Sequence, residues 1–264
     1  MEDFYASLNL NVESYESLCE PPPREIAGDI AFYVDTARRF GGPVLELACG
    51  TGRVARGLAE AGFDVWGVDA SPAMLALAKT LVAENAPSLS DRITFVEGRL
   101  ETFNLDERFP LSVIAYRSFL LLLTPEDQMA SLARMADHLA PGGGVVLHIF
   151  DPRLEYLTGQ QDLPNSEREG RSIVTGNIVR KSLLKADLDL MTQVRRDVWR
   201  HEEFDQNGKM CRREDLELAI RWTYRHEFAH LIAHAGFEIE AEFSDFEGAP
   251  PAYGGERVIV LRRA

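Results

Sequence analysis

Two glycines and one acid in the first third of the chain have types and spacing that suit a nucleoside ligand. Gly50 and Gly52 come directly after the apolar run 44–47, and Asp69 follows a second apolar run, 64–68. Glycine lets the backbone approach a ligand closely. A carboxylate one strand further along can accept hydrogen bonds from both hydroxyls of a ribose. Together these residues predict a nucleoside site.

Two classes of nucleoside ligand fit these residues. Residues 50–55 satisfy the degenerate dinucleotide fingerprint GxGxxG/A, whose helix N-terminus would bind a pyrophosphate. Glu46, however, places a carboxylate inside the apolar strand just before the glycines, where a pyrophosphate would gain nothing from a further negative charge. A cationic ligand would gain from it. S-adenosylmethionine carries an ammonium and a sulfonium, so this acid favours it over NAD.

The elements that must position these residues can be read from the hydrophobic pattern. The run 44–47 predicts a strand, 48–52 a tight turn, and 53–61 a helix that ends at Gly62. The run 64–68 predicts the next strand. Because parallel strands joined by a right-handed crossover end on the same edge of a sheet, we expect the glycines and Asp69 to meet there.

The segment Glu46-Leu47-Ala48-Cys49-Gly50-Thr51-Gly52 resembles the first motif of the class I S-adenosylmethionine-dependent methyltransferases. The similarity continues in residues 69–74 and in 140–143, which precede an apolar strand at 145–150. The resemblance implies an α/β fold, with a Rossmann-like doubly wound sheet of seven strands that ends in a C-terminal antiparallel hairpin. It also implies S-adenosylmethionine as the cofactor.

The resemblance also implies which residues hold that cofactor. Glu46 would hold the methionine ammonium, directly or through backbone and water, and Asp69 would hold the ribose. The family usually places an acid after the glycine that ends the third strand, but this chain has Arg99 there. The adenine contact would then come from Glu101, from the backbone of Leu100 or not at all, and the planar head of Arg99 could instead stack on the ring. The expected cofactor-binding residues are Glu46, Ala48, Cys49, Gly50, Thr51, Gly52, Asp69, Ala70, Met74, Arg99, Leu100, Glu101, Tyr116 and Arg117.

Catalytic residues are harder to predict, because methyl transfer depends mainly on alignment of the reactants and exclusion of water. A general base is needed only if the acceptor arrives protonated, and Tyr15, Asp151 and His201 are the candidates. Residues 226–230 match the HExxH zinc motif, with His234 one turn further on. No third ligand stands at a motif spacing, so we predict no metal and interpret this segment as the helix before the last strands.

The chain divides into four expected segments. Residues 1–43 would form an N-terminal lid with a helix at 26–40, and 44–151 the cofactor-binding core. Residues 152–225 change character to strand-like alternation around an Asn-Gly turn, which predicts an inserted antiparallel layer on the substrate side. Residues 226–264 would supply the last helix and hairpin of the core sheet.

Composition bounds the partners of the 264-residue chain. Its net charge of −14 argues against nucleic acid, because phosphates would be repelled. It has no apolar run long enough for a membrane span and no basic leader, so we expect no membrane partner and a cytoplasmic location. Three scattered cysteines predict free thiols. The expected partner is a small-molecule methyl acceptor, with the chain a monomer or homodimer.

Two other functions stay open from the sequence. An NAD-dependent oxidoreductase would bind a pyrophosphate at the glycines and would have no need of Glu46. A non-catalytic cofactor-binding module is suggested by Arg99 and by Leu120 and Leu121, which stand where relatives often carry a polar pair.

Overall fold

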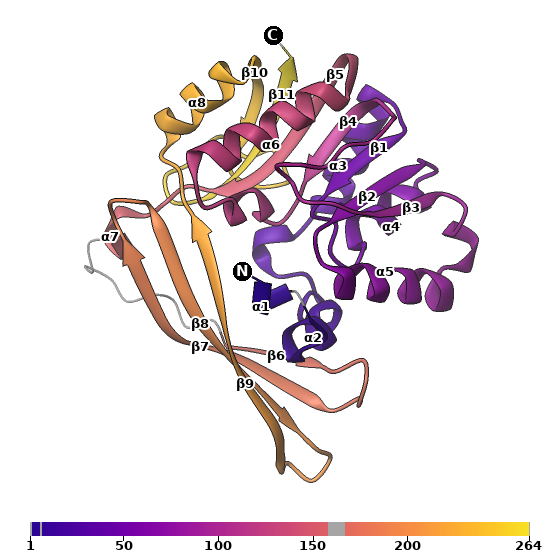
Figure 1. Cartoon of the computed structure of the whole chain (residues 1–264), viewed down its shortest axis with the longest axis vertical. Helices are drawn as coiled ribbons and strands as arrows, with labels where there is room; N and C mark the ends of the chain where they lie inside the picture. Colours follow the sequence, from indigo (N-terminus) through magenta and orange to yellow (C-terminus); the bar gives the residue numbers. More distant parts are fainter. Residues whose placement is uncertain (1, 6, 158–166, 264) are drawn as a thin grey trace.

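The computed structural model describes residues 2–5, 7–157 and 167–263, and its main feature is a seven-stranded sheet in the order β10-β11-β5-β4-β1-β2-β3 (Figure 1). The first five strands in sequence run parallel, and β11 pairs antiparallel with β5 and with β10. This confirms the Rossmann-like sheet and its C-terminal hairpin. The strands are β1 (Val44–Leu47), β2 (Val65–Asp69), β3 (Ile93–Glu97), β4 (Phe109–Ile114), β5 (Leu139–Phe150), β10 (Phe237–Phe243) and β11 (Glu256–Arg263).

Helices cover both faces of this sheet. Along β1, Leu45 and Leu47 pack into the core on one face while Val44 packs on the other, as alternation along a strand requires. Residues of α6 (Pro125–His138) and α8 (Arg225–His234) share the core of Leu45 and Leu47. Residues of α3 (Asp29–Phe40), α4 (Arg53–Glu60) and α5 (Pro72–Asn85) share the core of Val44.

Local sequence signals explain most helix boundaries. Ser71 caps α5 by accepting a hydrogen bond from the Met74 amide at 3.1 Å, and Pro72 occupies the first helical position. The N-terminal helix begins later than the predicted residue 26. Arg24–Ile26 instead form the short 3₁₀ helix η1, and Gly28 has a φ of +82°, so the α-helix α3 starts only at Asp29.

A second sheet of four antiparallel strands stands apart from the first, in the order β6-β7-β8-β9. The Asn207-Gly208 turn joins β8 to β9 as the sequence predicts, and Gly208 has a φ of +78°. This sheet is the expected antiparallel layer, which is inserted between β5 and α8 along the chain. Its strands are β6 (Arg168–Arg171), β7 (Ile178–Asp189), β8 (Val194–Phe204) and β9 (Met210–Arg221).

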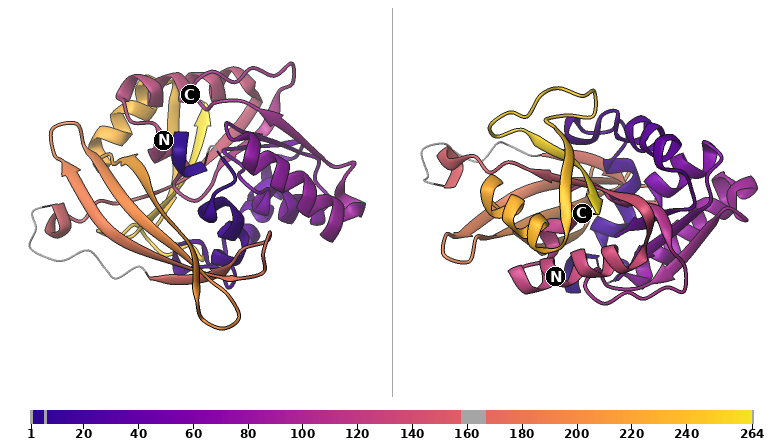
Figure 2. Two further views of the ribbon diagram at one scale, coloured as in Figure 1. Left: turned by 60° about the horizontal axis from the view of Figure 1, so that its bottom comes forward. Right: turned by 90° about the horizontal axis from the view of Figure 1, so that it is seen from above.

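The N-terminal helices α1 (Glu2–Tyr5) and α2 (Leu10–Leu18) lie between the two sheets (Figures 1 and 2). On the core side, Glu16 accepts a hydrogen bond from the Thr51 hydroxyl and forms an ion pair with Arg56 at 2.6 Å. On the other side, buried Glu13 forms an ion pair with Arg212 of β9 at 2.7 Å. The N-terminal segment therefore connects the two sheets.

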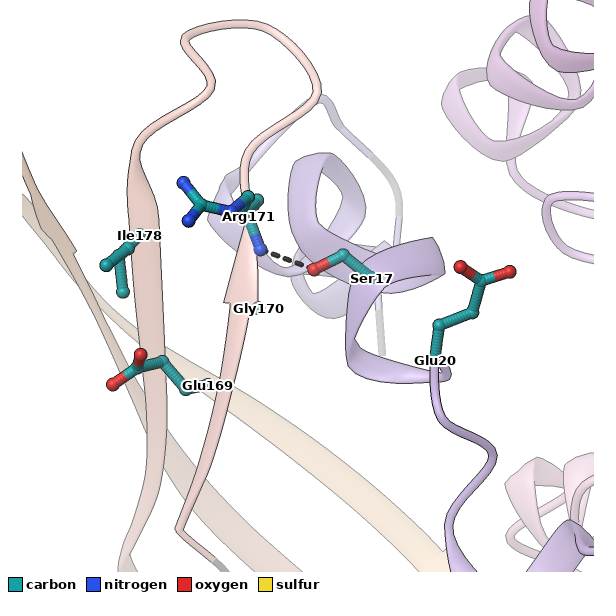
Figure 3. A pocket seen from close by; sticks show the side chains of 6 residues that line it. All are labelled: Ser17, Glu20, Glu169, Gly170, Arg171 and Ile178. Atoms are coloured by element: carbon teal, nitrogen blue, oxygen red, sulfur yellow. Dashed lines mark hydrogen bonds between the residues drawn. The ribbon is translucent and has the colours of Figure 1, made fainter. Parts of the chain in front are cut away.

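The end of α2 packs directly against β6 of the second sheet. Figure 3 shows the Ser17 hydroxyl accepting a hydrogen bond from the backbone amide of Arg171 on β6. The neighbouring Gly170 has no room for a side chain, because a Cβ there would lie 2.8 Å from the Ser17 hydroxyl oxygen and 3.0 Å from Leu18. Glycine at this position therefore allows helix and strand to pack in direct contact.

The short elements complete the description. These are α7 (Leu154–Leu157), η2 (Pro87–Leu89) and η3 (Ser118–Leu121). Among the described residues, none of the helices combines the length and apolar character that crossing a bilayer requires. The three cysteines are free thiols, as predicted: Cys19 and Cys49 are buried and Cys211 is exposed.

Candidate functional site

A cleft of about 1650 Å³ opens between the two sheets. Its floor is the edge where β1, β2, β3, β4 and β5 end, and its roof is formed by β6, β7, β8 and β9. The N-terminal segment closes one side, and the loop 244–255 between β10 and β11 borders another. All four parts of the chain that the sequence distinguishes therefore contribute residues to one cavity.

The end of β1 has the backbone geometry of a ligand site. Ala48 adopts a φ of +54°, which is uncommon outside glycine, and Gly50 a φ of +55°. A Cβ added to Gly50 would meet no atom within 4 Å, so this turn faces open space in the cleft. Strained backbone at a cavity edge is characteristic of functional sites.

The carboxylate of Asp69 lies beside this turn. One oxygen accepts a hydrogen bond from the Gly50 amide at 2.7 Å, and the other accepts one from the Ser71 amide at 2.8 Å. Burial raises the pKa of Asp69, and these amide bonds oppose that shift. Asp69 thus fixes the ends of β1 and β2 relative to each other, as the predicted shared edge requires.

Glu46 lies behind the turn and does not line the cleft. Its side chain is fully buried among β1, α3 and α4, and one carboxyl oxygen has no hydrogen-bond partner. Burial raises its pKa to about 8, while nearby Arg53 and a hydrogen bond from the Ala55 amide lower it. Because Ala55 is in the first turn of α4, Glu46 satisfies a backbone donor that the helix leaves free.

The residues after β2 and β3 form the next part of the floor. Met74 and Leu100 are almost completely buried and still border the cleft. Arg99 is exposed and pairs with Glu101 at 2.6 Å. Arg99, which departs from the family pattern, therefore pairs with an acid, Glu101, that also lines the cleft.

The end of β4 carries a second stretch of unusual backbone. Tyr116 has a φ of +47° and Arg117 a φ of +65°, and both line the cleft. Arg117 forms a two-bond ion pair with Glu256 of β11, which also bonds the Nε2 of buried His148 at 2.9 Å. The hydrogen bonds from His148 and Arg117 lower the pKa of Glu256 against the effect of burial.

The three candidate bases occupy different places. Tyr15 lines the cleft, and burial raises its pKa well above the ordinary value. Asp151 also lines the cleft, and its oxygens accept hydrogen bonds from the Gly254 amide at 3.0 Å and from Arg225 at 3.4 Å. His201 is completely buried in the second sheet outside the cleft lining, and burial lowers its pKa to about 3.

The structure brings most of the predicted residues together in this cavity. Those that line it are Tyr15, Ala48, Gly50, Asp69, Ala70, Met74, Arg99, Leu100, Glu101, Tyr116, Arg117 and Asp151. The predicted residues outside the lining are Glu46, Cys49, Thr51, Gly52 and His201.

Cys49, Thr51 and Gly52 support the turn from behind. The Thr51 hydroxyl donates to Glu16, and Gly52, with a φ of +76°, precedes the first residue of α4. A Cβ on Gly52 would lie 2.9 Å from the ring of Phe95, so the close packing of helix on strand also requires glycine there.

Sequence reasoning missed cleft residues from three regions. Tyr5 and Asn11 come from the N-terminal segment, and the loop 244–255 contributes several more. The charged residues of the roof were also missed, although the alternation in β7 and β8 could have shown which of them share a face. These roof residues are Arg168, Lys181, Arg195 and Asp197.

The HExxH segment has a structural role in α8. Glu227 accepts hydrogen bonds from Gln193 at 2.7 Å, from Arg221 at 2.5 Å and from the Tyr224 amide at 3.2 Å. It therefore belongs to the capping box of the helix and to its attachment to β9. Within the described part of the chain, no group of three or more His, Cys, Asp or Glu side chains has the arrangement of a metal site.

Residues 44–143 match the family model described as a methyltransferase domain. They include every core strand of the cleft floor except the end of β5. These residues form a methyltransferase domain. The chain is 25% identical over 218 residues to a putative methyltransferase, YqeM, of Bacillus subtilis (strain 168), an alignment that covers 82% of each chain.

Two solved structures show how far the similarity of fold extends along the chain. The CcbJ methyltransferase from Streptomyces caelestis superposes with a TM-score of 0.75 over 100% of this chain and 99% of its own, at 21% identity. CalS10 from Micromonospora echinaspora, an amino pentose methyltransferase solved with S-adenosylmethionine bound, gives 0.66 over 91% of each chain at 24% identity. The similarity of fold therefore includes the inserted sheet.

Proposed function

We propose that this enzyme transfers a methyl group from S-adenosylmethionine to a small molecule held between the two sheets. The observation that carries the proposal is the continuity of the cleft, which runs from Gly50 and Asp69 on the floor to Lys181 and Trp199 in the roof. One end suits the donor and the other an acceptor. The name of CalS10, an amino pentose methyltransferase, supports an acceptor of this size.

The residues at the floor fit the donor. The open turn at Gly50 would let the backbone approach the cofactor, and Asp69 would accept hydrogen bonds from the ribose hydroxyls. Met74 and Leu100 would pack against the adenine, next to the Arg99–Glu101 pair. Because Glu46 does not line the cleft, we infer that it acts on the methionine ammonium indirectly, by holding the Ala55 amide and the turn in place.

S-adenosylmethionine supplies an electrophilic methyl group on a positively charged sulfur. The chain would supply alignment and exclusion of water, with Tyr5 and Tyr15 of the N-terminal segment closing the cleft over the donor. A tyrosine is protonated at neutral pH, and burial raises the pKa of Tyr15 further, so Tyr15 would donate a hydrogen bond to the acceptor. His201 stays neutral and outside the cleft, which leaves Asp151 as the candidate base that the acceptor could reach.

Calorimetric titration with S-adenosylmethionine and S-adenosylhomocysteine, compared with NAD, tests the donor site. We expect micromolar binding of the two adenosyl ligands only. Asp69→Ala should weaken it by about a hundredfold or more, because it removes the bonds from two ribose hydroxyls and hydrogen bonds to a carboxylate contribute about 1.5–3 kcal/mol each. Asp64→Ala is the matched control, since Asp64 is exposed and pairs with Arg92 on the surface. Binding of NAD in place of the adenosyl ligands would favour the oxidoreductase.

Turnover separates an enzyme from a cofactor-binding module. Incubation with labelled S-adenosylmethionine and a panel of small amines should produce S-adenosylhomocysteine only when an acceptor is present. The four segments 1–43, 44–151, 152–225 and 226–264, the cytoplasmic location and the monomeric or homodimeric state stay predictions.

A further inference from the structure

The roof of the cleft holds two cations directly opposite each other. Arg168 of β6 and Lys181 of β7 are cross-strand partners in the antiparallel register, and both line the cleft. Like charges in this position normally destabilise a sheet. Both side chains nevertheless face the same cavity, in a chain whose net charge is −14.

The surroundings of Lys181 do not neutralise it. Its ammonium lies 3.4 Å from the Asn11 amide oxygen and sits near the rings of Phe4 and Trp199, 5.0 and 4.7 Å from their centres. Within the described part of the chain, Lys181 has no carboxylate within ion-pair distance. Burial and the charge of Arg168 lower its pKa to about 8, and Cys19 and Asp197 oppose that shift only in part.

Of the nearby acids, one pairs with Arg195 and one with Arg168, and among the described residues none pairs with Lys181. Asp197 lies four residues along β8 from His201, the cross-strand partner of Lys181, and it is paired with Arg195 at 2.6 Å. Glu25 accepts a bond from Arg168 at a long 3.3 Å, and Arg168 also reaches the Tyr116 hydroxyl at 3.4 Å. Because Tyr116 follows β4, this contact places Arg168 over the floor of the cleft.

The other cations of β7 behave differently. Arg180 pairs with Glu169 at 3.0 Å, and Lys185 pairs with Asp187. Both are exposed, whereas Lys181 faces the cleft. Lys181 is therefore the cation of β7 that has no acidic partner in the part of the chain that the structure describes, and it is also the one that a ligand in the cleft could reach.

We propose that Lys181 and Arg168 bind an oxyanion group of the methyl acceptor, a carboxylate or a phosphate. An oxyanion between them would relieve their repulsion and gain charge-assisted hydrogen bonds, from the arginine in a two-bond geometry and from the lysine as a point charge. This inference rests on the proposed function, since it assigns the acceptor end of the same cleft. It makes the acceptor an acidic molecule, such as an amino acid or a sugar phosphate.

Calorimetric titration with sulfate at constant ionic strength, with chloride as the replaced anion, tests the site. Sulfate is titrated into the protein both with and without saturating S-adenosylhomocysteine, so the result can be read whether or not the cofactor site behaves as proposed. We expect saturable millimolar binding that falls at least tenfold in Lys181→Met and in Arg168→Gln. The matched controls Lys185→Met and Arg180→Gln should bind sulfate like the parent chain.

Acetate and methyl phosphate, titrated in the same way, distinguish a carboxylate from a phosphate. The probe that binds more tightly indicates which of the two groups the acceptor carries. Methionine keeps the apolar contacts of Lys181 with Phe4 and Trp199, and circular dichroism checks that each variant folds. Absence of saturable binding, or equal binding by Lys181→Met, would overturn the inference. So would a tenfold loss of S-adenosylhomocysteine affinity in the same variants, because the pair would then bind the carboxylate of the cofactor.

Discussion

At the scale of single residues, Glu46 links the stability of the chain to pH. Its pKa in the folded chain, about 8, lies above the ordinary value of 4.5, so the folded chain holds the proton more tightly between those two values. The free energy of unfolding should therefore fall as the pH rises through this range. Because glutamine has no proton to lose, Glu46→Gln should be more stable than the parent by about 2–4 kcal/mol at about pH 8 and by much less at about pH 5.

Urea unfolding at the two pH values measures this difference. Glu60→Gln, at the exposed end of α4, is the control and should leave the pH dependence unchanged. An equal effect of Glu46→Gln at both pH values would show that Glu46 is charged in the folded chain.

The residue scale also shows where sequence reasoning succeeded. Gly50 and Asp69 lie together because glycine turns and strand ends follow from local pattern and from the handedness of the crossover. The position of the Glu46 side chain was harder to predict. A carboxylate in a strand points to one face of the sheet or the other. Which face Glu46 points to, and that it meets the Ala55 amide there, depends on how α4 packs on the sheet. The pattern of β1 alone does not give that packing.

At the scale of elements, α2 determines how firmly the cleft is closed. Glu16 attaches α2 to the start of α4 through Arg56 and Thr51, and Tyr15 beside it lines the cleft. Glu16→Gln should loosen this attachment and raise the dissociation rate of S-adenosylhomocysteine by about fivefold to tenfold, as the loss of about 1 kcal/mol predicts.

Stopped-flow displacement of a fluorescent adenosyl analogue would measure that rate. Glu20→Gln is the matched control, because Glu20 is exposed at the end of the same segment. A dissociation rate unchanged by Glu16→Gln would mean that α2 does not hold the ligand in the cleft.

The elements differ in how well the sequence predicted them. The core strands, the cap at Ser71 and the Asn207-Gly208 turn follow from short-range signals. The loop 244–255 has no periodic pattern, and its place beside the cleft depends on the pairing of β11 with both β10 and β5. The roof pair Lys181 and Arg168 is likewise visible only once β6 and β7 are in register.

At the scale of the whole molecule, the proposed ligand would contact three parts of the chain at once. S-adenosylhomocysteine at about a hundred times its Kd should stabilise the folded state by about 2.7 kcal/mol. For a chain of this length that corresponds to a rise in Tm of roughly 5–10 °C. We expect scanning calorimetry to show a single unfolding transition, which shifts as a whole to higher temperature when S-adenosylhomocysteine is bound.

A second transition that the ligand leaves unmoved would contradict this expectation, because it would mean that the four-stranded sheet unfolds independently of the core. Adenosine, which lacks the methionine part, is the control and should give a smaller rise. The result would also test the proposed division of the chain into segments.

The position of α1 and α2 between the two sheets has a consequence for synthesis on the ribosome. The Leu10 amide bonds the carboxylate of Glu214 at 2.8 Å, and Glu13 bonds the Ser172 hydroxyl at 2.7 Å. Leu10 and Glu13 therefore wait for partners that are translated 204 and 159 residues later, which at roughly 5–20 residues per second is a delay of about ten to forty seconds. During that time the face of α2 that is buried in the folded chain is open to chaperones, and the cleft can close only after β9 has been translated.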